Sequence, residues 1–448
     1  MFRSTKGRLR IAVVGTGISG LAAAWLLSKR HDVTVYEKAG RAGGHSNTVD
    51  VPGAGGDLPV DTGFIVYNPP NYPNLTALFA HLGVTTQPSE MSFAVSRCDG
   101  GLEYAGTSLA TLFAQRTNVL RPRFWAMLSD LRRFYRDAPG DLRRDRLNGL
   151  TLGEYLRQNN YRDAFLSDHL LPMAAAIWSA PAVSMLDCSA AAFVRFFDNH
   201  GLLLLRDRPQ WRTVSGGSRT YVNKLLEELR GDVRKNARVA SITRSDAGVE
   251  VLEADGGKAS FDHVVIATHS DEALALLREP SLDEERLLGA IRYRENEAVL
   301  HQDSALMPKR RSVWSSWNYV QTGGPEGSAH VTYWMNSLQG LPEDRPLFVT
   351  LDPQRTPRSV IRTESYSHPI FDAAAHRAQR ELWTLQGRRN TWFCGAYFGA
   401  GFHEDGLQAG LAVAEQLGGL RRPWSVPEES ARICLVPRDP VFPSEEAA

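Results

Sequence analysis

The stretch Val13-Val14-Gly15-Thr16-Gly17-Ile18-Ser19-Gly20 decides the fold of this chain. An apolar run over 11–14 leads into it and another over 21–27 follows it, so a strand, a tight turn and a helix are predicted in that order. Its three glycines have the spacing G-x-G-x-x-G, which lets a pyrophosphate approach the amino end of the helix. The predicted contacts in this turn are Gly15, Gly17, Ser19 and Gly20.

An acidic residue ends the second predicted strand. Glu37 follows the apolar run 33–36, a position from which a carboxylate accepts hydrogen bonds from a ribose 2′-hydroxyl. Strand, glycines, helix and acidic residue fall in this order within the first 37 residues, which accidental glycine-rich loops seldom achieve. The sequence therefore predicts an α/β chain with a Rossmann-like dinucleotide-binding domain.

The composition excludes several classes of protein. The 448 residues suffice for two or three domains, and 51 Lys and Arg nearly balance 50 Asp and Glu, so nothing indicates nucleic-acid binding. The basic clusters 121–146 and 309–311 are interpreted as solvated faces. The four cysteines lack metal-ligand spacing, so we expect no metal and a cytoplasmic location. The apolar run after residues 1–10 is too short for a signal peptide, and no run is long enough to span a membrane.

We expect the cofactor-binding domain to be discontinuous. It is predicted over 1–74, 205–270 and 388–420, where the apolar strands 263–267 and 391–393 lie. A substrate domain with a helical cap and a mixed sheet is predicted over 75–204 and 271–387: the segment 75–199 reads as mainly helical, and the aromatic-rich segment 298–350 as sheet. The tail 421–448 is expected to be an extended strap or partly disordered.

A second glycine-containing motif follows Glu37, namely Lys38-Ala39-Gly40-Arg41-Ala42-Gly43-Gly44-His45. Over nearly its whole length the chain resembles the glutathione-reductase-like flavoproteins of the amine oxidase and phytoene desaturase superfamily. The resemblance implies FAD, with Arg41 and Gly44 against its pyrophosphate. Nothing matches the glycine pair, cysteine and tyrosine of covalently flavinylated monoamine oxidases, so the FAD is expected to be noncovalent. The further cofactor-binding residues that the resemblance implies are Lys38, Gly43, His45, Asp61, Thr62, Gly63, Val239, Gly395, Glu404, Asp405, Gly406 and Leu407.

A closer resemblance is carried by the stretches Phe64-Ile65-Val66-Tyr67-Asn68, Met91-Ser92-Phe93, Ile177-Trp178-Ser179, Arg208-Pro209-Gln210-Trp211 and Gly401-Phe402-His403-Glu404-Asp405-Gly406. They are similar to the flavoprotein domain of plant cyclopropane fatty acid synthases and to its free-standing bacterial relatives. This resemblance implies a lipid or fatty acyl substrate. The methyltransferase half of the plant enzymes is absent, so a separate lipid methyltransferase is a candidate partner.

The last of these stretches leads into a predicted amphipathic helix over 407–417. A helix amino terminus stabilises the negative charge that develops at the N1 and C2 edge of a flavin when it accepts hydride. Glu404 and Asp405 either cap this helix or approach the flavin, and capping is favoured because a carboxylate beside a reduced flavin is repelled. Many relatives carry Asp where this chain has Ala396, which places the usual ribityl contact in doubt.

Three residues are candidates for catalysis. His403 can act as acid or base beside the flavin or hold the turn by a hydrogen bond, and His200 has a similar but weaker claim. Tyr397 is expected nearest the ring face. No lysine evidently matches the one that holds water at flavin N5 in many amine oxidases, although Lys224 remains open.

The leading hypothesis is an FAD-dependent oxidoreductase that takes hydride from an unsaturated or methyl-branched acyl chain, by desaturation or double-bond isomerisation. The alternatives are an amine or carotenoid-type oxidase, and a flavoprotein partner of a lipid methyltransferase. A lipid substrate would also bring peripheral contact with the inner membrane face, through basic residues such as Arg121, Arg123, Arg132 and Arg133.

Overall fold

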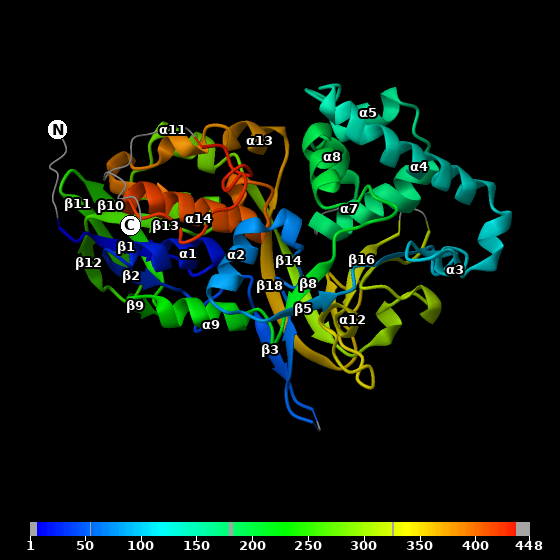
Figure 1. The fold of residues 1–448 in the computed structure, drawn as a ribbon, viewed down its shortest axis with the longest axis horizontal. Helices are drawn as coiled ribbons and strands as arrows, with labels where there is room; N and C mark the ends of the chain where they lie inside the picture. Colours follow the sequence, from blue (N-terminus) through cyan, green and yellow to red (C-terminus); the bar gives the residue numbers. More distant parts are fainter. Residues whose placement is uncertain (1–6, 54, 179–181, 325–326, 436–448) are drawn as a thin grey trace.

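The computed structural model describes residues 7–53, 55–178, 182–324 and 327–435. The chain forms two lobes joined by the long strand pair β14 and β18 (Figure 1). One lobe contains both β1 and α14, and so brings the beginning of the chain next to residues beyond 400. The predicted α/β fold with a Rossmann-like domain, a mixed sheet and a helical cap is confirmed.

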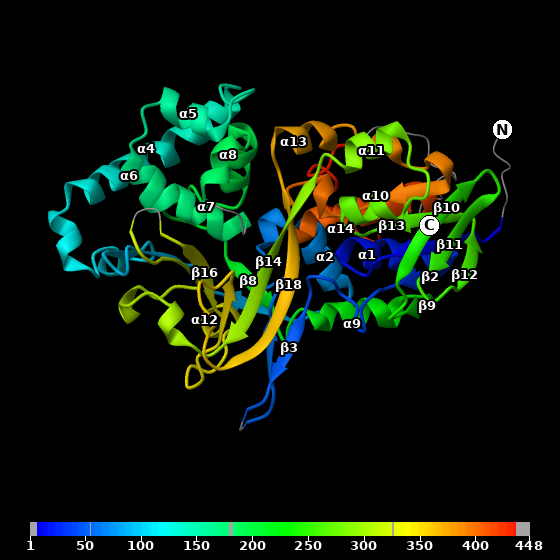
Figure 2. The ribbon, with the colours of Figure 1, turned by 180° about the vertical axis from the view of Figure 1, so that it is seen from behind.

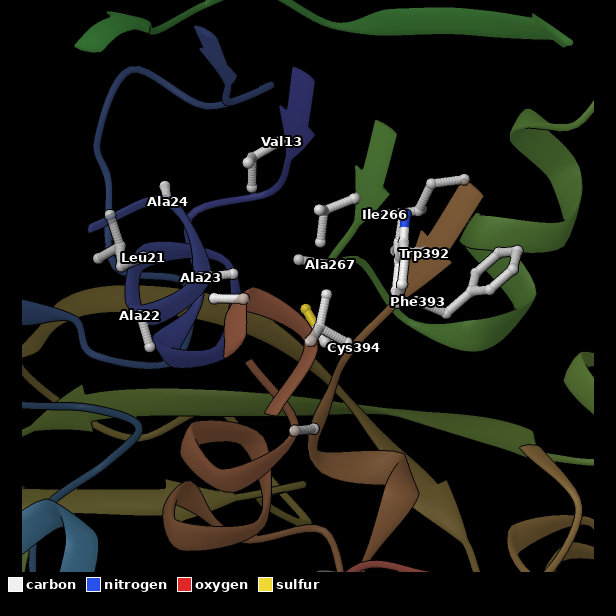
Figure 3. Close-up of a cluster of buried hydrophobic side chains, with 14 of the residues drawn as sticks. Val13, Leu21, Ala22, Ala23, Ala24, Ile266, Ala267, Trp392, Phe393 and Cys394 are labelled. Atoms are coloured by element: carbon white, nitrogen blue, oxygen red, sulfur yellow. The ribbon is translucent and has the colours of Figure 1, made fainter. Parts of the chain in front are cut away.

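The first lobe is built on a parallel five-stranded sheet. Its order is β19 (Thr391–Phe393), β13 (His263–Ile266), β1 (Arg10–Val14), β2 (Asp32–Tyr36) and β9 (Gly231–Arg234). Helix α1 (Ile18–Leu27) packs against α14 (His403–Gly418). Figure 3 shows side chains of β1, α1, β13 and the segment after β19 meeting in one apolar cluster, including Val13, Ile266 and Cys394. An antiparallel three-stranded sheet adds β10 (Val239–Ser245), β11 (Gly248–Glu253) and β12 (Lys258–Phe261).

The second lobe contains a seven-stranded mixed sheet. Its order is β18 (Val360–Ile370), β14 (Arg292–His301), β17 (Phe348–Leu351), β16 (Ala329–Trp334), β15 (Trp317–Gln321), β6 (Phe93–Arg97) and β7 (Leu102–Ala105). Only β15 and β6 pair in parallel in this sheet. Two ribbons pair β3 (Thr48–Val51) with β4 (Leu58–Asp61) and β5 (Thr86–Ser89) with β8 (Trp211–Val214).

Helices form the cap beside this sheet (Figure 2). They are α3 (Leu109–Leu112), α4 (Pro122–Arg143), α5 (Leu152–Gln158), α6 (Asp163–Phe165), α7 (Leu171–Trp178) and α8 (Ala190–Asn199). A π-helical turn, Leu166–Leu170, joins α6 to α7. The remaining helices are α2 (Pro73–His81), α9 (Arg219–Glu228), α10 (Ser270–Leu276), α11 (Leu282–Leu288), α12 (Met335–Gln339) and α13 (Ala373–Gln379). Among the described helices, none has the length and apolar character needed to cross a membrane.

Three sequence predictions differ from the structure. The segment predicted as mainly helical from residue 75 contains β5, β6 and β7, because the apolar residues of β6 complete the large sheet rather than a helix face. The helix predicted over 407–417 begins at His403 and is buried nearly all round, since it packs against α1, α2 and the following chain. Helices α10, α11 and α13, expected in the substrate domain, contribute to the core of the first lobe.

The predicted tail is an ordered strap as far as residue 435. Arg422 is buried and pairs with Glu415 at 2.7 Å, and Arg432 pairs with Asp405 at 2.6 Å. These two ion pairs fasten the strap to α14. Residues 436–448 of the predicted tail lie outside the described residues.

Candidate functional site

The turn between β1 and α1 leaves an open cradle at the helix start. Gly15 has φ of +102°, and a side chain on Gly20 would collide with the carbonyl oxygen of Gly15. Gly17 occupies the N-cap position of α1 but has no side chain that could accept hydrogen bonds from the helix. The first backbone amides of α1 therefore remain able to donate to a ligand. A Cβ atom on Gly17 would meet nothing within 4 Å. These features fit a pyrophosphate at this helix end.

Glu37 lies where β2 ends and braces the same turn. Its carboxylate is buried and accepts hydrogen bonds from the amide of Thr16 at 3.2 Å and the amide of Ala39 at 2.8 Å. The hydroxyl of Thr16 donates to it as well. Carboxylate oxygens accept more than one hydrogen bond each, so capacity for ribose hydroxyls remains. The chain before β10 lies beside it, because the amide of Ala237 donates to the carbonyl of Glu37 at 2.9 Å, two residues before buried Val239.

The loop after Glu37 packs onto the glycine turn. The amide of Gly43, whose φ is +115°, donates to the carbonyl of Thr16 at 3.1 Å. A Cβ atom on Gly44 would lie 3.1 Å from the Cα of Gly17. Arg41 fixes the loop by donating to the carbonyl of Gly44 at 2.8 Å. Lys38 instead is exposed and pairs with half-buried Glu272 at 2.6 Å.

The segment after β4 crosses this loop at His45, since a side chain on Gly63 would collide with the carbonyl of His45. Asp61 is buried and accepts hydrogen bonds from the amide of Ser218 at 2.9 Å and from its hydroxyl at 2.7 Å, next to the start of α9. Burial raises the pKa of Asp61 to about 6. The hydroxyl of Thr62 lies 2.7 Å from that of Tyr366.

His45 is the centre of a half-buried ring cluster that sequence reasoning did not assemble. Its ring stacks on Tyr366 at 4.9 Å, with His368 at 5.5 Å and His269 at 6.0 Å. Burial and the neighbouring histidines hold the pKa of His45 well below its usual value, so its imidazole is neutral. Two features of the sequence could have indicated this cluster. His269 follows a central parallel strand, and ligand-binding sites gather at the carboxyl ends of such strands. Tyr366 and His368 are two residues apart in a strand, so their side chains share one face.

Beyond β19, Gly395 is covered by the ring of Tyr397, which a side chain on Gly395 would strike. The hydroxyl of Tyr397 is buried and has no hydrogen-bond partner among the described residues. Burial raises the pKa of this hydroxyl well above its usual value. Cys394 is buried and unpaired by disulfide, and Ala396 offers no carboxylate.

The start of α14 lies against the first turn of α1. A Cβ atom on Gly406 would lie 3.0 Å from the side chain of Ile18, and Leu407 is fully buried. Asp405 accepts the amide of Phe402 at 2.8 Å, which caps α14.

Glu404 is directed elsewhere. Its carboxylate accepts the amides of Asn74 at 3.0 Å and Leu75 at 2.9 Å, so it caps α2. Each carboxylate therefore caps a helix, Asp405 its own helix α14 and Glu404 the neighbouring α2.

His403 is enclosed by three residues. Its Nε2 lies 3.0 Å from the hydroxyls of both Ser46 and Tyr221, and its ring stacks on Phe64. Burial lowers the pKa of His403 to about 3, so the imidazole is neutral at pH 7. It can hold both hydroxyls or accept a proton, but it is not an imidazolium acid.

His200 lies one aromatic ring away from the α14 start. Its Nδ1 donates to the carbonyl of Phe196 at 2.8 Å, and its ring centroid lies 5.8 Å from that of Phe402, the residue before His403. Burial lowers its pKa to about 3. With Arg208 and Trp211 it lines a cavity of about 250 Å³. Of the three catalytic candidates, the structure thus places His403 beside the glycine-motif loop, Tyr397 over Gly395 and His200 in the cap.

The comparisons agree with this geometry. Residues 18–301 match the family model "Flavin containing amine oxidoreductase". The Mycobacterium tuberculosis protein named "Putative flavin-containing monoamine oxidase AofH" is 28% identical over 76% of this chain and 70% of its own length. A fatty acid isomerase from P. acnes that produces CLA has a similar fold, with a TM-score of 0.64, 16% identity and coverage of 91% of this chain and 98% of its own. Cyclohexylamine oxidase from Brevibacterium oxydans gives a TM-score of 0.60, 15% identity and coverage of 91% and 99%. The chain belongs to the flavin-containing amine oxidoreductase family and is an FAD-dependent oxidoreductase.

Proposed function

We propose that this FAD-dependent oxidoreductase acts on an unsaturated or methyl-branched acyl chain of a lipid, by desaturation or double-bond isomerisation. FAD supplies hydride acceptance at N5 when bound. An unactivated alkyl C–H bond is a poor hydride donor, so the position attacked is allylic or next to a stabilising substituent.

One observation carries the proposal: the dispersed stretches that resemble the cyclopropane fatty acid synthase flavoproteins meet around the start of α14. Phe64 stacks on His403 at 3.7 Å, and Phe402 stacks on Phe196 at 4.7 Å. Trp178 contacts the same Phe196 at 4.6 Å. The stretches at Met91 and at 208–211 line the cavity beside His200. Their common location supports a shared substrate region.

The character of this region favours an apolar substrate. Stacked aromatic rings form much of it, and three carboxylates around the start of α14 already have partners: Asp405 binds Arg432, Glu404 caps α2 and Asp61 binds Ser218. Glu90 lines the cavity beside His200, where its carboxylate accepts a hydrogen bond from the hydroxyl of Ser337. A cationic amine would need a free carboxylate or a comparable anion as its partner. These three acids do not provide one.

The chain's own residues have definable tasks in such a reaction. The aromatic cluster excludes water from the substrate region. The neutral imidazole of His403, held by Ser46 and Tyr221, is a group able to accept a proton from the substrate. The amino end of α14 offers backbone amides to developing negative charge.

An amine oxidase is the second candidate, supported by the family match and the name of the M. tuberculosis relative. The position of Lys224 argues against an amine oxidase. The sequence left this lysine as a candidate for the residue that holds water at flavin N5 in many amine oxidases. Its ammonium donates to the carbonyls of Leu82 and Gly83, each at 2.8 Å, at the end of α2. A flavoprotein that serves a separate lipid methyltransferase, at the inner membrane face, is the third candidate.

Anaerobic mixing of the FAD-loaded protein with candidate substrates distinguishes the three candidate functions. Phospholipid with unsaturated chains is expected to bleach the flavin absorbance of a desaturase. For an isomerase, product analysis by mass spectrometry shows a displaced double bond without net bleaching. Bleaching by putrescine or cyclohexylamine, with no effect of lipid, would overturn the proposal in favour of an amine oxidase. Reduction that requires an added lipid methyltransferase would support the partner role instead.

A further inference from the structure

The edge of the helical cap carries an unusual group of exposed apolar side chains. Four of the exposed large hydrophobic residues lie within one short segment: Leu109 (76% exposed), Val119 (48%), Leu120 (84%) and Trp125 (49%). Elsewhere in the described residues, such side chains are Leu204, Leu205, Leu282, Val360 and Leu435. We call the segment 106–125 the tip. It includes α3, at the outer edge of the lobe in cyan (Figures 1 and 2).

The tip is a built surface rather than a loose loop. The hydroxyl of Ser108 accepts the amide of Thr111, which caps α3. The ring of Phe113 contacts Trp125 at 5.6 Å and so joins α3 to the first turn of α4. The indole of Trp125 donates to the carbonyl of Val119 at 2.8 Å. Its polar atom is thereby satisfied while half of the side chain remains exposed.

The charge of the tip has one sign. From Tyr104 to Ser129 the sequence holds three arginines, Arg116, Arg121 and Arg123, and no Asp or Glu. Arg123 is engaged by Asp163 and Asp168, whereas Arg116 is exposed.

A second basic segment, 309–311, lies beside α3, although the sequence places it almost 200 residues away. Val313, two residues after it, packs with Ala114 of the tip, and a Cβ atom on Gly100 would lie 3.0 Å from the side chain of Lys309. Arg310 pairs with buried Glu103 at 2.6 Å, and Arg311 lies 3.7 Å from Glu343, so Lys309 adds the freest charge. The first residue of the basic cluster 121–146 lies at the same edge, because Arg121 donates to the carbonyl of Gly101 and Arg310 to that of Gly100.

We propose that the tip docks the protein onto an anionic lipid surface. Leucine and tryptophan side chains insert at the boundary of headgroups and acyl chains, and arginines beside them attract acidic headgroups. The positive charge of the tip favours an anionic lipid surface over a neutral apolar partner. The inference rests on the proposed function, because a lipid substrate has to be taken from a membrane. It adds the surface that makes the contact.

Vesicle sedimentation tests the docking without turnover. FAD-loaded protein is mixed with vesicles of saturated phosphatidylcholine, alone or with saturated phosphatidylglycerol, at low and high salt. Binding is expected with the anionic vesicles and is expected to weaken as salt is raised. The double variant Leu109→Ser/Leu120→Ser is expected to lose at least tenfold in partitioning, and Arg116→Glu about fivefold or more. Matched controls are Leu282→Ser and Arg278→Glu, exposed residues of the other lobe, and Leu204→Ser/Leu205→Ser, the other exposed leucine pair.

The outcomes are distinguishable. Wild-type binding by the tip double variant, or equal loss in a control, would overturn the docking surface. So would a wild-type dimer in sedimentation equilibrium that the tip variant converts to monomer, because the tip would then bind a second copy of the chain. Saturated vesicles contain no allylic position, so binding does not depend on turnover. Flavin reduction by detergent-dispersed unsaturated lipid tests the proposed function separately.

Discussion

The imidazole of His403 lies face to face with the phenyl ring of Phe64, with ring centroids 3.7 Å apart and planes 12° apart. This stack joins the first residue of α14 to the segment that follows β4, and it leaves the imidazole edge facing Ser46 and Tyr221. His403 is half-buried and neutral as a consequence. The same condition holds at His200 and His169, and it makes the protein sensitive to acid.

Acid is predicted to unfold the protein steeply below neutral pH. Burial lowers the pKa of His403, His200 and His169 to about 3, whereas the unfolded chain protonates them near 6.5. Their stabilising contribution is full above pH 6.5 and falls as the pH falls toward 3. Three such groups give a slope of about 4 kcal/mol per pH unit between pH 4 and 6. Urea unfolding at pH 4, 5 and 6 measures this slope, and His200→Phe is expected to lower it by about 1 kcal/mol per pH unit. An unchanged slope would contradict the burial argument.

Substitution of Gly17 is predicted to remove the cofactor while leaving the fold intact. A Cβ atom there meets no protein atom, so Gly17→Val places its side chain in the open cradle where pyrophosphate is expected. The purified variant should be colourless with a circular dichroism spectrum like that of wild-type apoprotein. Gly106→Val, which also meets no atom within 4 Å, is the control and should stay yellow. Gly20→Val should lose both fold and colour, because its side chain strikes the carbonyl of Gly15. A yellow Gly17→Val protein would move the phosphate site elsewhere.

Loss of the Glu37 charge is predicted to weaken FAD binding in two ways. The carboxylate braces Thr16 and is the group expected to meet the ribose, so Glu37→Gln removes charge-assisted hydrogen bonds worth about 1.5–3 kcal/mol. Titration of apoprotein with FAD should show about tenfold to a hundredfold weaker affinity. Lys38→Gln is the neighbouring control, because Lys38 is exposed and pairs with Glu272. Equal effects of the two substitutions would contradict the role given to Glu37.

Removal of Arg432 is predicted to destabilise the α14 start. Arg432→Met leaves the carboxylate of Asp405 buried without its cation, at a cost of about 3–5 kcal/mol. The double variant Arg432→Met/Asp405→Asn should recover much of this loss in thermal unfolding. Arg421→Met, an exposed neighbour, should change stability little. Additive losses in the double variant would show that the ion pair is not the cause.

Local pattern was sufficient to predict much of the cofactor domain. A few neighbouring residues were enough to recognise the apolar strand around Val264 and Val265 and the glycine spacing after Val14. Such local patterns do not predict contacts between segments that are distant in the sequence. The pairing of Asp405 with Arg432 and the stacking of His45 on Tyr366 have no local signature, so the ring cluster and the strap were not found. Phe93 shows the same limit, because its strand pairs not only with the adjacent β7 but also with the strand of Trp317, more than 200 residues away.

The position of β1 has a consequence for how the protein is made. This strand is synthesised first, yet its neighbour β13 begins beside Asp262, which accepts the amide of Arg10 from 252 residues further along. At about 5–20 residues per second, the ribosome delivers that neighbour roughly 10–50 seconds later. The amino end of α14 emerges later still, so the nascent chain holds half of its cradle exposed until residues beyond 403 have been made. We therefore expect FAD to be captured only after α14 has been made, and cells starved of riboflavin should accumulate apoprotein rather than stalled fragments.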